Sequence, residues 1–240
     1  MKPQVRREHY FAGYDNPNRF ASYWHQIDET SRLGGRVIEI GIGNGTVAAV
    51  LRARGLEVTT VDIDPDLDPD VVADIRELPF PDDAFDTALA AEVLEHLPWE
   101  TVSIAMGELM RIARRGVVIS VPNSDVAFSL DARLPNVIQL FRLAVRRRLP
   151  LRNALWAATQ RPAWRRSGGP LPGFAEIARL NQKPLKCDEH FWELGARGIF
   201  RKDFVAVAEG VGLRLVHDFR APRFPIHHFF VFTRPAANQN

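Results

Sequence analysis

Residues 37–46 read VIEIGIGNGT, a short apolar run that ends in three glycines at alternate positions. Residues 45–54 follow with apolar side chains at helical spacing. Glycine permits a tight turn and lets the backbone approach a ligand closely. The stretch therefore predicts a strand, a glycine turn and a helix, with a ligand at the turn. Such turns are also common as purely structural connections, and that interpretation stays open.

The same alternation continues along the chain and predicts a doubly wound α/β fold. Short apolar runs separated by amphipathic segments are typical of a parallel sheet that helices cover on both faces. The expected strands are 36–40, 57–62, 71–73, 85–90 and 117–121, with helices at 45–54 and 99–113. After a long interruption, the pattern resumes with a helix over 201–211 and strands over 213–217 and 227–233.

The glycine spacing helps to separate two ligand classes. A dinucleotide fingerprint needs G-x-G-x-x-G, but Thr46 stands where its third glycine would be. Glu39, two residues before Gly41, would also repel a pyrophosphate. A carboxylate there favours a cationic or amine-bearing ligand, so a nicotinamide-dependent oxidoreductase is a disfavoured alternative.

Further acidic residues follow the next predicted strands. Asp62 ends the second strand, where a carboxylate can accept hydrogen bonds from both hydroxyls of a ribose. Asp74 follows the third strand, and Glu92 and His96 follow the fourth. The alternative roles are a turn aspartate for Asp62 and a turn or helix cap for Asp74. His96 is interpreted as structural.

Together these segments resemble one family. The segments VIEIGIGNGTVA, VTTVDIDP, ADIRELPFPDDAFDTALAAEVLEHLP and ELMRIARRGVVISVPN are similar to class I S-adenosylmethionine-dependent methyltransferases, in the type 11-like branch that acts on small molecules. The resemblance covers about residues 36–123 with the last helix and two strands. It implies a Rossmann-like sheet of seven strands with an antiparallel last strand, which residues 227–233 fit.

The resemblance also implies a role for each matching residue, with S-adenosylmethionine as the cofactor. Glu39 would lie by the methionine part, and the ribose hydroxyls would bind Asp62. The cofactor-binding set is Glu39, Gly41, Gly43, Asp62, Ile63 packed on the adenine, Asp74 accepting its amine, Ile75 through its backbone, and Glu92 near the carbonyl that holds the amino group. We expect no metal site.

His190 is the candidate catalytic residue. It lies in Cys-Asp-Glu-His-Phe-Trp, just before the final helix, and could act as a general base towards a hydroxyl acceptor. A capping or packing role is the alternative. For His227 and His228, strand alternation predicts that at most one faces the core, and we expect no metal role for the pair.

The chain divides into three expected parts. Residues 1–35 form a helical segment over the cofactor, and residues 36–124 with 187–240 form the core. Residues 125–186 are a basic helical cap, with two helices within residues 135–160 that split near Pro150. This insertion holds 12 Lys and Arg against 3 Asp and Glu, although the whole chain carries a net charge of only +2.

The basic insertion suggests two kinds of contact. Arg146, Arg147 and Arg148 adjoin apolar residues, and such a face can lie on an anionic membrane surface or contact an acidic acceptor. A solvated cap is the alternative interpretation. Nucleic acid is not an expected partner, because no recognisable nucleic-acid-binding module accompanies the charge. The oligomeric state is not indicated by the sequence.

The remaining composition indicates an ordinary globular protein. It is 46% hydrophobic and 25% charged, and its single cysteine, Cys187, excludes a disulfide framework. No apolar run is long enough for a signal peptide or a spanning helix, so we expect a cytoplasmic protein. The predicted function is methyl transfer to oxygen of a small or lipid-like acceptor. The alternative is a non-catalytic cofactor-binding or regulatory protein.

Overall fold

The computed structural model describes residues 7–124, 190–196 and 198–235, together with Val5 and the backbone of residues 127–133 and 139–146. The chain divides into two compact units. The first contains residues 1–123 and 189–240, and the second contains residues 124–188.

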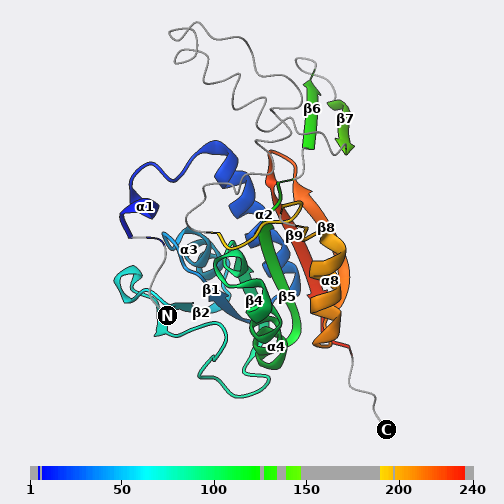
Figure 1. The fold of residues 1–240 in the computed structure, drawn as a ribbon. Helices are drawn as coiled ribbons and strands as arrows, with labels where there is room; N and C mark the ends of the chain where they lie inside the picture. Colours follow the sequence, from blue (N-terminus) through cyan, green and yellow to red (C-terminus); the bar gives the residue numbers. More distant parts are fainter. Residues whose placement is uncertain are drawn as a thin grey trace, which may run out of the picture. The chain divides into compact units, whose positions relative to one another are not determined.

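The first unit contains a seven-stranded sheet in the order β3-β2-β1-β4-β5-β9-β8 (Figure 1). Strands β1 to β5 pair in parallel, and β9 is antiparallel to both β5 and β8. This confirms the predicted Rossmann-like, doubly wound sheet with an antiparallel last strand. The strands are β1 (Arg36–Ile40), β2 (Glu57–Asp62), β3 (Val71–Val72), β4 (Phe85–Ala91), β5 (Ala113–Pro122), β8 (Arg214–Ala221) and β9 (Phe224–Thr233).

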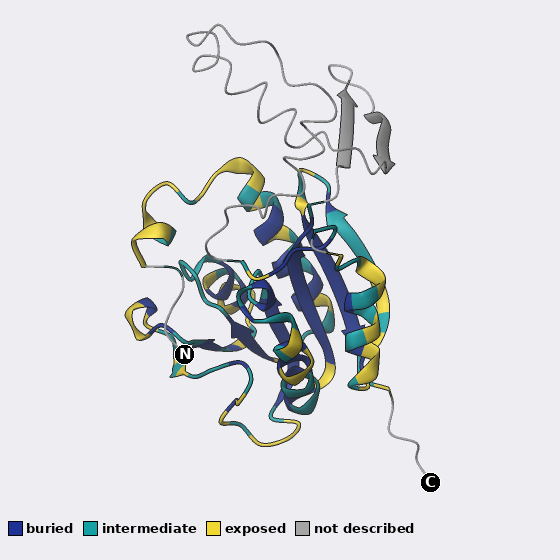
Figure 2. Cartoon of the chain, viewed as in Figure 1, coloured by how far each residue is buried: buried dark blue, intermediate teal, exposed yellow. Residues whose placement is uncertain are grey.

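Helices cover both faces of this sheet. Helices α2 (Pro17–Leu33) and α3 (Thr46–Ala53) pack on one face, and α4 (Val102–Ile112) and α8 (Arg201–Gly210) pack on the other. The central strands are consequently buried on both sides, as the dark blue sheet in Figure 2 shows. The short elements are α1 (Arg7–Phe11), η1 (Pro65–Leu67), η2 (Leu94–His96) and η3 (Trp99–Thr101).

Local sequence explains where α2 begins and ends. Asn16 caps its first turn, accepting hydrogen bonds from the backbone N–H groups of Asn18 and Arg19 at 3.0 and 3.1 Å. Gly34 ends the helix with a φ of 64° and donates its N–H to Thr30. Among the described helices, none is both long and apolar enough to cross a membrane.

Both histidines of β9 are buried, which corrects the prediction that at most one faces the core. They do point to opposite faces, as strand alternation requires. His227 lies on the side of α2, where its Nδ1 is 2.9 Å from the hydroxyl of Ser22. His228 lies on the other side and stacks on Phe230. Because helices cover both faces, each side of this strand is core.

The second unit departs from the predicted helical cap. Strands β6 (Ala127–Arg133) and β7 (Gln139–Arg146) pair in antiparallel register, with Phe128 opposite Val145. The helix expected over the start of residues 135–160 is therefore wrong for 139–146, which pair with residues 127–133 as a strand instead. The rest of that prediction, including Pro150, Arg147 and Arg148, lies outside the described residues.

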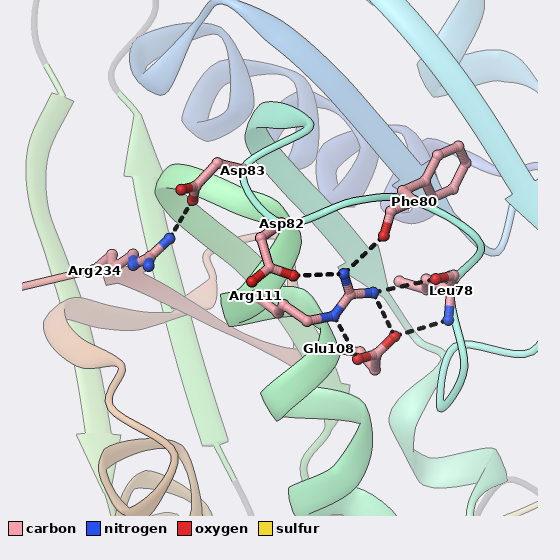
Figure 3. A network of polar contacts seen from close by, with 7 residues as sticks. All are labelled: Leu78, Phe80, Asp82, Asp83, Glu108, Arg111 and Arg234. Atoms are coloured by element: carbon pink, nitrogen blue, oxygen red, sulfur yellow. Dashed lines mark hydrogen bonds and ion pairs between the residues drawn. The ribbon is translucent and has the colours of Figure 1, made fainter.

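Arg111 of α4 holds the long connection between β3 and β4 in place (Figure 3). Its guanidinium makes two 2.8 Å hydrogen bonds with the Glu108 carboxylate, and it donates to the carbonyls of Leu78 and Phe80. Asp82 accepts a further hydrogen bond at 3.0 Å. Glu108 in turn accepts the N–H of Leu78 at 2.8 Å. This network fixes the segment that follows Asp74 and Ile75.

Candidate functional site

The glycine turn joins β1 to α3 and adopts the conformation that its sequence predicts. Gly41, Gly43 and Gly45 all have positive φ, at 82°, 55° and 75°. At Gly41 a Cβ atom would also come within 2.4 Å of a methyl group of Val93. An L-residue at position 41 would thus be strained both by its backbone and by this contact.

Glu39 lies directly before this turn and is buried. Its Oε2 atom has no hydrogen-bond partner among the described residues. Burial raises the pKa of Glu39 to about 8, and the charge of Asp62 adds to the shift while Arg52 opposes it. A buried oxygen without a partner costs free energy, so the site suits a ligand that donates a hydrogen bond or carries positive charge there.

Asp62 connects the end of β2 to the glycine turn. Its Oδ2 accepts the N–H of Ile42 at 3.0 Å, and its Oδ1 accepts the N–H of Asp64 at 2.9 Å. Burial raises the pKa of Asp62, although these backbone hydrogen bonds oppose the shift. An ionised carboxylate can accept about four hydrogen bonds, so the Asp62 carboxylate retains acceptor capacity for a ligand hydroxyl. Ile63 beside it is half-buried.

Asp74 is already engaged by a neighbouring cation. Arg76 donates from Nε to Oδ1 at 2.9 Å and from Nη2 to Oδ2 at 2.6 Å. These hydrogen bonds lower the pKa of Asp74, so its carboxylate is ionised and oriented. The side chain of Ile75 is 5% exposed and packs in the core. The adenine contacts predicted for Asp74 and Ile75 stay predictions.

Glu92 lies beyond the end of β4 in a left-handed conformation, with a φ of 56°. Its backbone N–H donates to the carbonyl of Ser120, and the Ser120 hydroxyl donates to its Oε1, both at 2.8 Å. Its Oε2 is 3.3 Å from Nε2 of His227. Burial raises the pKa of Glu92 to about 8. The side chain thus faces β5 and β9, and the predicted cofactor contact through its carbonyl stays a prediction.

The N-terminal segment lies against the glycine turn. Asn44 donates to both carboxylate oxygens of Asp15, at 3.1 and 3.0 Å. Arg19 donates to the Tyr14 hydroxyl at 2.6 Å and lies over its ring. A cavity of about 310 Å³ between this segment and the turn is lined by Tyr10, Phe11, Gly13, Tyr14, Asp15, Asn44 and Thr46. Its volume is at the lower end of the range of small-molecule pockets.

His190 lies at the same sheet edge as Glu92, in the chain that returns to α8. Its Nδ1 is 3.2 Å from Oε1 of Glu193, and its ring packs edge-on against His96 at 4.9 Å between centroids. Glu95 lies beside these histidines and is fully buried. The structure therefore brings His190 together with Glu193, His96 and Glu95. Neither glutamate was expected in the site from the sequence, and His96 was interpreted as structural.

Residues 38–121 match the family model described as "Methyltransferase domain". Residues 38–121 thus carry a methyltransferase domain. Its glycine turn, Glu39, Asp62, Asp74 and Glu92 all fall within or beside the matched segment. The N-terminal segment and His190 lie outside it.

Relatives of the methyltransferase domain agree with this family. An uncharacterized methyltransferase of Mycobacterium sp. strain KMS is 30% identical over 114 residues, which cover 42% of this chain and 44% of the relative. A relative from strain JLS is 32% identical over the same length. The chain thus matches less than half the length of these curated relatives.

Solved structures share the fold of the methyltransferase domain. The magnesium protoporphyrin IX methyltransferase of Synechocystis PCC 6803, solved with bound S-adenosylhomocysteine, has a TM-score of 0.55 at 14% identity and covers 98% of this chain and 90% of its own. The N-methyltransferase NodS of Bradyrhizobium japonicum WM9, in complex with the same ligand, has a TM-score of 0.55 at 13% identity and covers 95% and 96%. At such low sequence identity, the similarity to these solved structures concerns the fold alone.

The residues of the methyltransferase domain fit S-adenosylmethionine. The buried Glu39 oxygen without a partner is available to accept a hydrogen bond from the methionine part of the cofactor. Asp62 retains acceptor capacity for a ribose, and the glycine turn leaves backbone accessible between them. Both carboxylates lie at the carboxyl ends of neighbouring parallel strands, which is where doubly wound sheets bind ligands.

Proposed function

We propose that this chain transfers a methyl group from S-adenosylmethionine to an oxygen atom of a small or lipid-like acceptor. The observation that carries the proposal is the pair of acidic residues, the buried Glu39 and the half-buried Asp62, on either side of the glycine turn of a methyltransferase domain. Both carboxyl groups disfavour a pyrophosphate, which carries neither positive charge nor hydrogen-bond donors, whereas the amine, sulfonium and ribose hydroxyls of S-adenosylmethionine supply these.

The cofactor residues have distinct tasks. Asp62 would accept the ribose hydroxyls while its bond to Ile42 keeps the glycine turn in register. Glu39 would compensate positive charge at the buried end of the site. When bound, S-adenosylmethionine supplies an electrophilic methyl group on a sulfonium sulfur, so the protein mainly orients the acceptor and excludes water.

His190 is the proposed base on the acceptor side. When an acceptor hydroxyl takes up the methyl group of bound S-adenosylmethionine, His190 would accept the hydroxyl proton. Glu193 supports this role, because its carboxylate at 3.2 Å from Nδ1 can orient the imidazole. A nitrogen acceptor would need less help from a base, which is how the two acceptor atoms can be told apart.

The basic insertion would contact an anionic acceptor or an anionic membrane surface. Its charge of 12 basic against 3 acidic residues supports this part of the proposal. Sedimentation with anionic vesicles tests it, by comparing the natural chain with a triple change of Arg146, Arg147 and Arg148 to Glu. Equal binding of both proteins would contradict membrane contact.

Calorimetry followed by turnover tests the proposed function. We expect micromolar binding of S-adenosylmethionine and S-adenosylhomocysteine and none of NADH. An acceptor screen read out by S-adenosylhomocysteine release should then find turnover with a hydroxyl compound. His190→Ala should lower that turnover and leave cofactor affinity near normal. His217→Ala, which changes a histidine of β8 that pairs with Glu29, should change neither turnover nor cofactor affinity. Tight cofactor binding with no turnover of any acceptor would favour the non-catalytic alternative.

A further inference from the structure

Glu95 is the most unusual buried group at the carboxyl edge of the sheet. Its side chain is 0% exposed, and neither carboxylate oxygen has a hydrogen-bond partner within the described part of the chain. A carboxylate is costly to bury without a partner, and its charge is normally compensated by a cation or a metal ion. The family resemblance gives this residue no role.

Two histidines face this carboxylate. One ligand-capable atom each from Glu95, His96 and His190 lies within 4.8 Å of the others. The ligands of a tetrahedral Zn²⁺ at about 2.1 Å are about 3.4 Å apart, so these side chains would need to close in by little more than about 1 Å. Two imidazoles and one carboxylate form the donor set of many catalytic zinc sites.

The backbone around these three residues is already fixed. Phe191 donates its N–H to the carbonyl of Glu95 at 2.8 Å. Trp192 donates its indole N–H to the carbonyl of Leu97 at 3.1 Å. The turn that carries Glu95 and His96 is thus bonded to the segment that carries His190, so the order of the site does not depend on a bound ion.

His190 has an outer hydrogen-bond partner of the kind that metal-binding histidines usually have. Nδ1 of His190 faces the buried carboxylate of Glu193 at 3.2 Å, which leaves Nε2 for a cation. A carboxylate on the second ring nitrogen is the usual outer partner of a metal-bound imidazole. Glu92 places a second carboxyl group close to Glu95. A bound cation stabilises the ionised form of nearby carboxyl groups, so these surroundings favour a cation.

We propose that Glu95, His96 and His190 form a binding site for a divalent transition-metal ion of the zinc type. The mixed nitrogen and oxygen donors favour Zn²⁺ over Mg²⁺ and Ca²⁺, which prefer oxygen ligands alone. In the ion-bound state, His190 is a ligand rather than the free base of the proposed function. The site would form whether or not the chain transfers methyl groups.

Zinc titration of the chelator-treated full chain tests the site. With a chromogenic chelator as competitor, we expect one Zn²⁺ bound per chain and no comparable binding of Mg²⁺ or Ca²⁺. Glu95→Gln and His190→Ala should each weaken zinc binding more than about 100-fold, since even outer-partner changes cost 10- to 100-fold. His217→Ala, which removes a half-exposed histidine paired with Glu29, should leave zinc affinity unchanged.

Thermal unfolding provides a second readout that does not require activity. Zn²⁺ should raise the Tm of the natural chain and of His217→Ala, but not that of Glu95→Gln. Without zinc, Glu95→Gln should be about as stable as the natural chain, because the amide has nearly the same size as the buried carboxyl group that it replaces. Zinc affinity that survives both Glu95→Gln and His190→Ala, or no zinc binding by the natural chain at about 100 µM, would overturn the proposal. Neither result depends on whether an acceptor is ever found.

Discussion

Ile42 donates its backbone N–H to Oδ2 of Asp62 at 3.0 Å, so the glycine turn after β1 is fastened to the last residue of β2. The same carboxylate caps the next turn through Asp64. One side chain thus sets the shape of the turn and presents acceptor oxygens to a ligand. Shape and recognition at this site are therefore coupled through Asp62.

Asp62→Ala should weaken binding of S-adenosylmethionine by about 10-fold or more. A hydrogen bond to a charged group contributes about 1.5 to 3 kcal/mol, and the glycine turn also loses its tie. Calorimetry of both proteins measures the difference. Asp66→Ala removes an exposed aspartate of the same loop and should bind normally. Equal affinity in the Asp62 variant would contradict its role at the ribose.

Glu39→Gln should change how stability depends on pH in the cofactor-free chain. The pKa of Glu39 is raised from 4.5 to about 8 by burial, so between these values the folded state holds a proton that the unfolded state has lost. The free energy of unfolding therefore falls as pH rises through this window, by about 1.4 kcal/mol per pH unit for one proton.

Urea unfolding of both proteins between pH 5 and 8 checks this prediction. The glutamine variant should lose about one proton's worth of the downward slope, to which Glu92 also contributes, and Glu57→Gln, which changes an exposed glutamate, should keep the full slope. Parallel curves for the natural chain and Glu39→Gln would show that Glu39 is not protonated in the folded state.

His228 should make the fold sensitive to acid. Burial lowers its pKa to about 4, although the bond to Asp218 opposes the shift. The unfolded chain therefore binds a proton at His228 from about pH 6.5 downwards, and the folded chain does not until about pH 4. Stability contributed by the neutral imidazole is present above pH 6.5 and is lost as pH falls towards 4.

His228→Gln tests this assignment, because an amide can still donate to Asp218 without titrating. The carboxylate of Asp218 is 2.6 Å from Nε2, and the Asn123 amide is 2.9 Å from Nδ1, which assigns the imidazole proton to Nε2. The variant should lose about one proton's worth of slope between pH 6.5 and 4 in guanidinium unfolding. If the pH dependence of the free energy of unfolding were unchanged, His228 would already be protonated in the folded state between pH 6.5 and 4.

Arg111→Met should lower the free energy of unfolding by about 2 to 3 kcal/mol. The change leaves Glu108 without its two guanidinium hydrogen bonds and frees the carbonyls of Leu78 and Phe80 (Figure 3). Arg32→Met removes an exposed arginine paired with Asp28 and should cost less than about 0.5 kcal/mol. Chemical denaturation of the three proteins measures both values. A similar cost for the two variants would mean that the network adds nothing beyond a surface ion pair.

The fold was predictable because its signals are local. The alternation of apolar runs and glycine turns locates each parallel strand, and Gly41 to Gly45 mark the switch from strand to helix. Residues 139–146 could not be read in this way. Their apolar residues at short spacing fit a helix or a strand equally well, and pairing with residues 127–133 decides between them.

The candidate site was predictable only in part, for a different reason. Asp62 and Glu39 lie next to the glycine turn in sequence, so their meeting follows from the strand order. Glu95 and His190 are separated by nearly a hundred residues, and only the tertiary fold brings them together. The repeated pairing of an acid with a histidine, in Glu95-His96 and in His190 to Glu193, was the only hint in the sequence.

The position of β9 between β5 and β8 has a consequence for how the chain is made. Among the described strands, the outer edge of β5 pairs only with β9, whose first residue is Phe224. During synthesis, the apolar residues Val117 to Val121 are thus complete long before their partner strand leaves the ribosome. Until then they present an unpaired edge of the kind that recruits other chains. A nascent chain of this protein needs either a chaperone or rapid synthesis of its second half, and fragments that stop short of residue 224 should aggregate.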